Sequence, residues 1–548
     1  MTCRWLSVWA LGLAAACGNE AASTNPSADV VLSVDFDQRS HRVGRLIGWN
    51  IGAGSRYSPL DGSRHPEWRT EEATESLRRL SEIRPANGDR PVVRFSGLQI
   101  DGALGFDGYH FFDFADPQTD PTPTDNVAPF EYMAMIDEID ADPMVMLNFG
   151  SGTAEEASDY ARHLVGIDEG DPFVAARAFW GREEPWPVAL YEIGNEIHEP
   201  FNTGYSGSGP FSYANPDADN GGDPPWFGKP ASSAQDYADR ALEYVDRVLE
   251  VQPDARFYIP LTQSTWTAWG GPEQSLPALA PLLERPEVVG VVVHQYIIDD
   301  GQAGHGWEKA EDAWLLTSGA FYRTLFRDLR AMLDSLERDE PLEITVTEYL
   351  GSALDPMGSL YAADLSVADM FLLYADVGVN LAIEHMTLAE NPAANPIVRP
   401  WHKPFFTKAG TLMNRPAFEI TKLLAEHLWH HVVTIVPTEL PKAHQALGDS
   451  GYDYELVRSV AFVSDDGESG SVILLNRDLE QERTVEVVVG DGDAVASVRG
   501  VAPEDIWIDT LEVAGELKQI AFEQAGERVR LTLPPHSLTA IAIERSAQ

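Results

Sequence analysis

The sequence predicts an α/β protein in which a (β/α)8 TIM barrel precedes a C-terminal antiparallel β-sandwich. Between residues 44 and 431, apolar segments typical of β-strands alternate with amphipathic segments typical of helices. Eight such alternations within this stretch favour a closed barrel of parallel strands. After His431 the pattern changes to short alternating strands separated by Asp, Gly and Pro turns, which indicates a second, all-β domain.

The expected barrel strands are short, and several are almost continuously apolar. The run Val288-Val289-Gly290-Val291-Val292-Val293 is typical of a parallel strand that is covered on both faces. An open, doubly wound sheet is the alternative, but no Gly-x-Gly-x-x-Gly segment follows the first strand. The eight strands are predicted at Leu46–Asn50, Val92–Phe95, Met144–Asn148, Leu190–Asn195, Phe257–Leu261, Val288–His294, Ile344–Thr347 and Leu381–Glu384.

Two of the intervening helices have readable starts. Thr153 with Glu156, and Ser232 with Gln235, have the spacing of capping boxes. The segments that follow, Ala154–Val165 and Gln235–Val251, carry apolar residues at helical spacing. The long loops after strands two and four, residues 96–125 and 197–230, are rich in Gly, Pro, Asn and aromatic residues, and active sites of barrels are built from such loops.

The sandwich is predicted over residues 432–548 and the barrel domain over residues 30–431. Sandwich strands are expected at Ser471–Asn476, Thr484–Val489 and Arg528–Leu533. The segment Val30–Phe36 alternates in the same way although it precedes the barrel, so it either opens the barrel domain or crosses over to the sandwich.

The N-terminus predicts export. Residues 1–17 have a short positive region, an apolar run and small residues before Cys17, which is typical of a signal peptide. Leu13-Ala14-Ala15-Ala16-Cys17 resembles a bacterial lipoprotein signal, in which Cys17 is lipidated and becomes the mature N-terminus. An ordinary cleaved signal is the alternative and would leave the protein periplasmic or secreted. Residues 18–29 suit a flexible tether between the cell envelope and the domain.

Charge and cysteine content exclude several classes of function. The chain of 548 residues has 86 acidic and 39 Lys and Arg residues, a formal net charge of -47, which disfavours binding to nucleic acid or to a membrane through a basic patch. Its two cysteines, Cys3 and Cys17, both lie in the signal region, so no disulfide or Cys-ligated metal is expected in the domains. No histidine spacing is typical of a catalytic metal site, and no cofactor is expected.

Two glutamates end predicted barrel strands at the same rim. Glu196 ends the segment Tyr191-Glu192-Ile193-Gly194-Asn195-Glu196 on strand four, and Glu348 ends strand seven. Retaining glycoside hydrolysis requires a carboxylic acid that protonates the leaving oxygen and a carboxylate that attacks the anomeric carbon. We therefore expect Glu196 to be the acid/base and Glu348 the nucleophile. The alternative, an ordinary exposed strand-end glutamate, would apply to either residue alone.

The motif set resembles clan A of the glycoside hydrolases and is most similar to the family 51 α-L-arabinofuranosidases. Gly194-Asn195-Glu196 resembles the acid/base motif of that family. The segment Leu147–Ala157 is similar to its third-strand Asn-Leu-Gly-Thr-Gly-x-x-Glu-Glu-Ala run, and Val93–Gly97 to its second-strand Arg-Tyr-Pro-Gly-Gly. Leu533–Leu538 is similar to the end of its sandwich domain.

The sequence departs from that family at two places. Thr347-Glu348-Tyr349 stands where the family usually has Asp-Glu-Trp, and Leu98 replaces the second glycine of the strand-two motif. The strand-four segment is also close to that of the family 79 glucuronidases and heparanase-like enzymes. The resemblance therefore implies the clan and the mechanism more firmly than the sugar.

Five further residues are expected to bind substrate or support the catalytic pair. Arg94 would hold Glu348 ionised through a charge-assisted hydrogen bond or would form a structural ion pair with Glu192. Asn195 would bond the sugar 2-hydroxyl or cap the strand. The resemblance implies that Tyr296 bonds the nucleophile and that Asn148 lines the sugar subsite. His294 belongs to the same His-x-Tyr arrangement, although a buried structural histidine is the alternative. Glu384 ends strand eight, where the clan does not place its acid.

The sequence thus predicts an exported glycoside hydrolase, an α-L-arabinofuranosidase acting as a retaining exo-glycosidase on polysaccharide side chains. A glucuronidase, xylosidase or endo-glycanase of the same clan is the first alternative. A catalytically inactive glycan-binding lipoprotein is the second. The expected partners are a polysaccharide or oligosaccharide substrate, the membrane through the lipid anchor alone, and further copies of the chain in a homo-oligomer.

Overall fold

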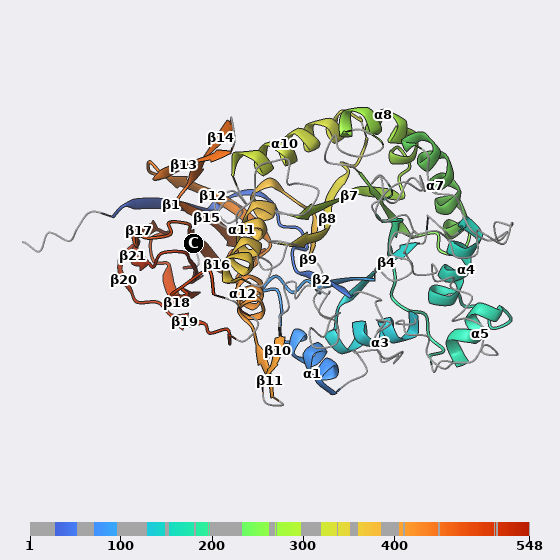
Figure 1. Ribbon diagram of the computed structural model, residues 1–548, viewed down its shortest axis with the longest axis horizontal. Helices are drawn as coiled ribbons and strands as arrows, with labels where there is room; N and C mark the ends of the chain where they lie inside the picture. The colour runs from blue at the N-terminus through green and yellow to red at the C-terminus, as the bar shows by residue number, and fades with distance from the viewer. Residues whose placement is uncertain are drawn as a thin grey trace, which may run out of the picture.

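The structure, a computed structural model, consists of a barrel and a large β-sheet domain with two helices between them (Figure 1). The barrel lies at the right of the figure and the sheet domain at the left. The described residues are 28–51, 71–95, 129–147, 149, 153–179, 182–195, 197, 233–261, 269, 271–296, 319–336, 338–350, 360–384, 405–408, 411–447, 450–508, 510 and 513–546.

Eight parallel strands close the barrel in sequence order, as predicted. Closure is made by β2 and β9, where Trp49 pairs with Glu384. All eight strands fall where the sequence predicts them, with ends that differ by up to a few residues. The strands are β2 (Gly48–Ile51), β3 (Val92–Phe95), β4 (Asp142–Leu147), β5 (Leu190–Ile193), β6 (Arg256–Pro260), β7 (Val288–Tyr296), β8 (Glu343–Leu350) and β9 (Leu381–Glu384).

The helices that connect these strands lie around the barrel (Figure 1). They are α1 (Glu71–Leu80), α3 (Pro129–Ile139), α4 (Ala154–Val165), α5 (Pro172–Phe179), α7 (Ala234–Leu249), α8 (Pro272–Leu283), α10 (Ala320–Asp334) and α11 (Tyr361–Val377). A further helix, α12 (Pro416–Ala425), follows the last barrel strand. The predicted cap of α4 is confirmed, because the Thr153 side chain accepts a hydrogen bond from the Glu156 amide. The predicted cap of α7 is wrong by one residue: Ser233, not Ser232, accepts from the Asp236 amide. Consecutive serines make the two positions equivalent in sequence.

Side chains that point into the barrel form an apolar lower layer. Strand residues alternate between the two faces of a sheet, so positions two apart share a direction. Inward residues near the amino ends of the strands form one apolar cluster: Val92, Met144, Leu190, Tyr258, Val292, Leu381 and Ile383. Two residues further along the strands, the same inward positions carry Arg94, Met146, Glu192 and His294. The barrel interior therefore changes from apolar to polar toward the carboxyl ends of its strands.

The second domain is built on a 10-stranded sheet with the order β19-β18-β22-β16-β15-β12-β1-β17-β21-β20. The N-terminal strand β1 (Val30–Arg42) lies in this sheet, between β12 (His431–Pro437) and β17 (Arg483–Val488). The β1 and β17 strands are parallel, so the domain departs from the purely antiparallel arrangement that was predicted. The other strands are β15 (Val457–Val463), β16 (Ser469–Asn476), β18 (Ala494–Val501), β19 (Lys518–Gln519), β20 (Phe522–Ala525), β21 (Arg528–Leu533) and β22 (Ser537–Glu544).

Two hairpins complete the chain. One is formed by β10 (Phe405–Lys408) and β11 (Thr411–Asn414), between the barrel and α12. The other is formed by β13 (Lys442–Leu447) and β14 (Ser450–Glu455), next to the large sheet. Among the described helices, none is long and apolar enough to cross a bilayer.

The helices α11 and α12 join the two domains into one apolar core. Leu372 and Leu373 on α11 and Leu423 on α12 cluster with Phe462 and Ile473 of the sheet. Because α11 is covered by the barrel on one side and by the sheet on the other, almost all of its residues are buried. This explains why its sequence is apolar around its whole circumference, which is the pattern of a fully buried helix.

A buried ionic cluster crosses this interface. Asp369 on α11 is fully buried, and its carboxylate lies 3.4 Å from Nη1 of Arg477 and 3.7 Å from Nε of Arg458. Burial lowers the pKa of Arg458 to about 10, against the opposing effect of Asp369, so the guanidinium remains charged at neutral pH. Two buried cations of the sheet domain thus share the carboxylate of Asp369 in the barrel domain.

We predict that Asp369→Asn lowers the free energy of unfolding by about 3 kcal/mol, because removal of one member of a buried ion pair leaves the other charges uncompensated. Urea unfolding followed by circular dichroism measures the change. Asp328→Asn is the matched control, because that carboxylate is more than half exposed and pairs with its neighbour Arg327. A loss for Asp369→Asn no larger than that of the control would contradict the role of the cluster.

Candidate active site

A β-bulge in β8 directs Glu348 into the barrel. Val293 pairs with Val346 across β7 and β8, but the next pair is His294 with Glu348, so Thr347 is an extra residue. The Thr347 side chain contacts His294 and that of Glu348 contacts Arg94, so both face the interior, while Tyr349 packs outside the barrel against Tyr374. Bulges of this kind re-aim side chains next to active sites. Without the extra residue, strict alternation would send Glu348 outward.

The guanidinium of Arg94 is the centre of the polar layer. Its Nε and Nη2 bond the two carboxylate oxygens of Glu192 at 2.6 and 2.9 Å. Its Nη1 bonds Oε1 of Glu348 at 2.7 Å. The predicted alternatives, support of Glu348 and an ion pair with Glu192, are both present in this geometry. Arg94 and Glu192 are fully buried, and Glu348 is 6% exposed, so water screens these charges little.

Two asparagine side chains complete the donor set of Arg94. Nη1 also donates to Oδ1 of Asn50 at 3.1 Å, and Nη2 donates to Oδ1 of Asn195 at 2.7 Å. A guanidinium carries five N–H groups. Two contacts with Glu192 and one each with Glu348, Asn50 and Asn195 match that number. The side chain is therefore fixed in plane and in rotation by residues of β2, β5 and β8 and by the turn after β5.

Gly194 allows Asn195 to reach this cluster. The chain leaves β5 at Gly194 with a φ of +79°, which lies in the left-handed region that favours glycine. A Cβ at this position would also lie 2.9 Å from side-chain atoms of Phe149 and Ile197. Because Arg94 donates to Oδ1 of Asn195 at 2.7 Å, the Asn195 amide is oriented by the cluster.

His294 contacts the same carboxylate as Arg94 does. Its Nδ1 lies 3.4 Å from Oε2 of Glu348, and its Nε2 lies 3.0 Å from Oγ1 of Thr347. If the Thr347 hydroxyl donates to Nε2, then Nδ1 carries the proton and points to Glu348. Arg94 and His294 thus contact different oxygens of the Glu348 carboxylate.

Three residues of the cluster were missed by the sequence analysis: Asn50, Met146 and Thr347. Asn50 is fully buried, and its amide nitrogen donates to the backbone oxygen of Thr347 at 2.6 Å, which supports the bulge. The Met146 thioether lies 3.3 Å from Nη2 of Arg94. Asn50 was detectable, because it is a polar residue at the carboxyl end of a barrel strand. The bulge at Thr347 leaves no signal in strand periodicity.

The charges of the cluster do not cancel. Burial alone would lower the pKa of Arg94, but the charges of Glu192 and Glu348 outweigh that effect and raise the pKa above its ordinary value. Arg94 is therefore always a cation, and the two carboxylates share it.

Within the described residues, no group of three or more His, Cys, Asp or Glu side chains is arranged to hold a metal ion.

Several predicted site residues lie outside the described residues. These are Glu196, Asn148, Cys17 and the side chain of Tyr296, whose backbone ends β7. Arg94, Asn195, His294 and Glu348 are brought together in one cluster. Glu384 pairs in register with Trp49 and Tyr349, whose side chains pack outside the barrel. Its side chain therefore has the outward parity, and Glu384 is not a member of the cluster.

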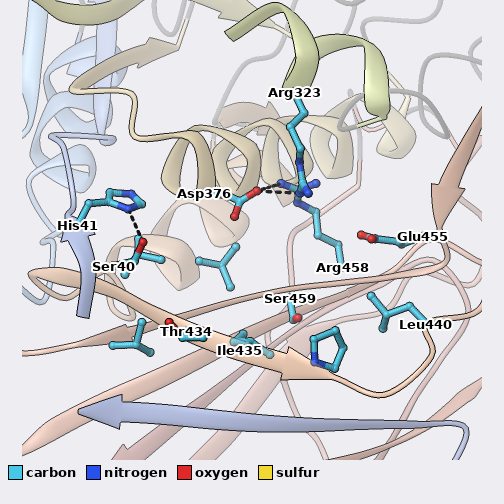
Figure 2. Close-up of a pocket in the computed structure, with 14 residues that line it drawn as sticks. Ser40, His41, Arg323, Asp376, Thr434, Ile435, Leu440, Glu455, Arg458 and Ser459 are labelled. Atoms are coloured by element: carbon cyan, nitrogen blue, oxygen red, sulfur yellow. Dashed lines mark hydrogen bonds and ion pairs between the residues drawn. The ribbon is translucent and has the colours of Figure 1, made fainter. Parts of the chain in front are cut away.

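A separate cavity of about 300 Å³ lies at the seam between α10, α11 and the large sheet (Figure 2). In Figure 2, Arg323 and Arg458 both point to Asp376. The distances from their nitrogens to the Asp376 carboxylate are 2.7 and 3.6 Å. Asp376 lies in the last turn of α11, just before β9 begins, and thus near the amino ends of the barrel strands. The cavity is therefore distinct from the Arg94 cluster at the carboxyl ends.

Comparison with solved structures shows which proteins share this fold. AbfB, a family 51 α-L-arabinofuranosidase from Bifidobacterium longum, has a TM-score of 0.71 and 13% identity, over 95% of this chain and 100% of that chain. The GH51 arabinofuranosidase from Xanthomonas axonopodis pv. citri has a TM-score of 0.69 and 16% identity, over 94% of this chain and 100% of that chain. These similarities confirm the predicted barrel with a C-terminal sandwich and the structural resemblance to family 51.

Sequence comparison gives a shorter match. A protein named probable alpha-L-arabinofuranosidase C from Aspergillus fumigatus (strain CBS 144.89 / FGSC A1163 / CEA10) is 26% identical over 121 residues, which is 20% of this chain. The chain spans only 23% of the length of that relative. No protein-family model matches the chain. The likeness to these proteins is therefore one of fold over most of the chain and of sequence over one segment.

We predict that Arg94→Met lowers the free energy of unfolding by about 3 to 5 kcal/mol at neutral pH, because two buried carboxylates lose their common cation. Urea unfolding followed by circular dichroism measures the loss. A loss of less than about 1 kcal/mol would contradict the assignment of Glu192 and Glu348 as the charges that Arg94 neutralises.

Proposed function

We propose that this protein is a retaining glycoside hydrolase and that Glu348 is its nucleophile. The observation that carries the proposal is the position of Glu348: it is nearly buried at the carboxyl ends of the barrel strands, in contact with Arg94 and His294. Active sites of (β/α)8 barrels lie at this face. The contact with a permanent cation favours the ionised carboxylate, which is the form that attacks a sugar.

In the first step, a carboxylate oxygen of Glu348 attacks the anomeric carbon while Glu196 gives its proton to the leaving oxygen. The glycosidic bond breaks, and a covalent glycosyl-enzyme forms. In the second step, Glu196 takes a proton from water, the water oxygen attacks the anomeric carbon, and the bond to Glu348 breaks. Glu196 is assigned this role because it directly follows Asn195, which contacts Arg94.

We propose a terminal α-L-arabinofuranosyl residue of a polysaccharide as the substrate. Support comes from proteins named arabinofuranosidases among the structures of the same fold and from the short sequence match. The amide of Asn195 is suited to bond a sugar hydroxyl beside the attacked carbon, where such contacts strengthen in the transition state. A glucuronide, a xyloside or an internal glycan bond is the second candidate, because the strand-four segment resembles that of other families in the clan.

Residues 1–17 support a proposal about the cellular location of the protein. We propose that the signal segment exports the chain and that lipidation of Cys17 anchors it at the cell envelope, with residues 18–29 as the tether. Radiolabelled fatty acid incorporated by the native chain and lost in Cys17→Ser would test the anchor.

We predict that Glu348→Gln lowers kcat by roughly 10⁴-fold or more on an aryl α-L-arabinofuranoside, because the variant lacks the attacking carboxylate. Nitrophenol release measures the rate across a panel of aryl glycosides. Glu384→Gln is the matched control, since it changes another buried glutamate at the end of a barrel strand, and it should keep activity within a few-fold. Comparable activity in Glu348→Gln and the control would contradict the assignment.

We also predict that the reaction retains the anomeric configuration and that the enzyme removes terminal residues (exo action). Methanolysis of the aryl glycoside should give the methyl glycoside with the starting anomeric configuration, because two displacements at one carbon restore it. Proton NMR of the early product measures the configuration, and product analysis on a branched polysaccharide measures the mode of action. An inverted product would contradict a covalent intermediate, and release of oligosaccharides in place of arabinose would contradict exo action.

A further inference from the structure

Glu192 is a buried carboxylate that the proposed two-glutamate chemistry does not use. It is fully buried inside the barrel, on β5, and contacts Arg94 through both oxygens. Ionised carboxylates are rarely retained in a protein interior unless they are paired, and even paired ones are often less stabilising than apolar residues of similar size. Nearby inward positions, such as Val92 and Leu190, are apolar. The presence of Glu192 therefore requires an explanation beyond packing.

The geometry divides the guanidinium of Arg94 into two edges. Glu192 occupies the edge formed by Nε and Nη2, the fork geometry that gives the strongest arginine–carboxylate pair. Glu348 receives a single bond from Nη1. The cation is thus bound more completely by the carboxylate outside the proposed chemistry than by the proposed nucleophile.

Charged and titratable groups from three described strands lie near Glu348. Arg94 approaches from β3, His294 from β7, and Glu192 lies behind Arg94 on β5. Asn50 and Asn195, which also bond Arg94, carry no charge. Among the described residues, Glu192 is a negative charge that offsets Arg94, so its removal would strengthen the effect of the guanidinium charge on Glu348.

We propose that Glu192 is a positioning residue that acts through Arg94: it fixes the guanidinium so that Nη1 faces Glu348, and its charge prevents Arg94 from stabilising the Glu348 carboxylate too strongly. This inference rests on the proposed role of Glu348 as nucleophile. A carboxylate bound by an uncompensated cation is a weaker base and a weaker nucleophile. Arg94 thus keeps Glu348 ionised, and Glu192 keeps that carboxylate reactive.

Glu192→Gln tests the charge separately from the position. The amide oxygen can still accept one bond from Arg94, and the bonds to Asn50, Asn195 and Glu348 remain, so the guanidinium keeps four of its five contacts. We expect the acid limb of the kcat/KM profile to move to lower pH by about one unit. We also expect kcat to fall by about tenfold with KM changed less than twofold, because the effect falls on the chemical step.

Glu343→Gln is the matched control. Glu343 is at the start of β8, at the opposite end of the barrel, where it bonds Tyr258 and Arg256. It should leave both the acid limb and kcat unchanged. Glu192→Asp is a second variant. It keeps the charge, but its side chain is one methylene shorter, so the carboxylate lies farther from the guanidinium. It should shift the acid limb in the same direction by a smaller amount, and it provides the test if Glu192→Gln does not fold.

A measurement without turnover separates this inference from the proposed function. Carbon-13 NMR of the folded protein, labelled at glutamate carboxyl carbons and assigned with Glu348→Gln, gives the titration midpoint of Glu348. We expect that midpoint to be about one unit lower in Glu192→Gln than in the native chain, whether or not any glycoside is cleaved. An unchanged or higher midpoint would overturn the inference. A lower midpoint without hydrolysis of any glycoside would overturn the proposed function alone.

Discussion

The site depends on one fully occupied guanidinium. Arg94 has five N–H groups, and its five bonds to oxygen atoms come from Glu192, Glu348, Asn50 and Asn195. Because these residues belong to neighbouring and opposite parts of the barrel wall, the guanidinium can be satisfied only when the barrel is closed in the correct register. Lysine could not replace it, since an ammonium offers three donors from one atom and no fork. The chemistry at Glu348 is thus tied to the integrity of the barrel.

Strand periodicity explains how the sequence produces the polar layer around Arg94 above an apolar layer. Successive inward positions on β3 are Val92 and Arg94, and those on β5 are Leu190 and Glu192. The apolar residues close the lower part of the barrel, which excludes water from beneath the cluster and strengthens its electrostatic interactions. Glu348 alone requires an irregularity, the extra residue Thr347, to join the layer. The bulge is held by Asn50, which bonds both the Thr347 backbone and Arg94.

Much of this arrangement was predictable from the sequence, and the exceptions have physical causes. The alternation of strand-like and helix-like segments identified all eight barrel strands, and the ends of those strands identified Arg94, His294 and Glu348. The cap of α7 was misplaced because Ser232 and Ser233 are chemically equivalent. The bulge and the role of Asn50 were not predictable, since they depend on contacts between β2 and β8, which are separated by about three hundred residues.

In the proposed reaction, Glu348 forms a covalent bond to the sugar. Mass spectrometry of the protein after incubation with an aryl 2-deoxy-2-fluoro-α-L-arabinofuranoside tests it most directly, because the fluorine slows release of the covalent intermediate. We expect a mass increase of one fluoroglycosyl group, located by peptide mapping on Glu348. A stable label on any other residue, or turnover of the ordinary glycoside with no covalent species under any condition, would contradict it.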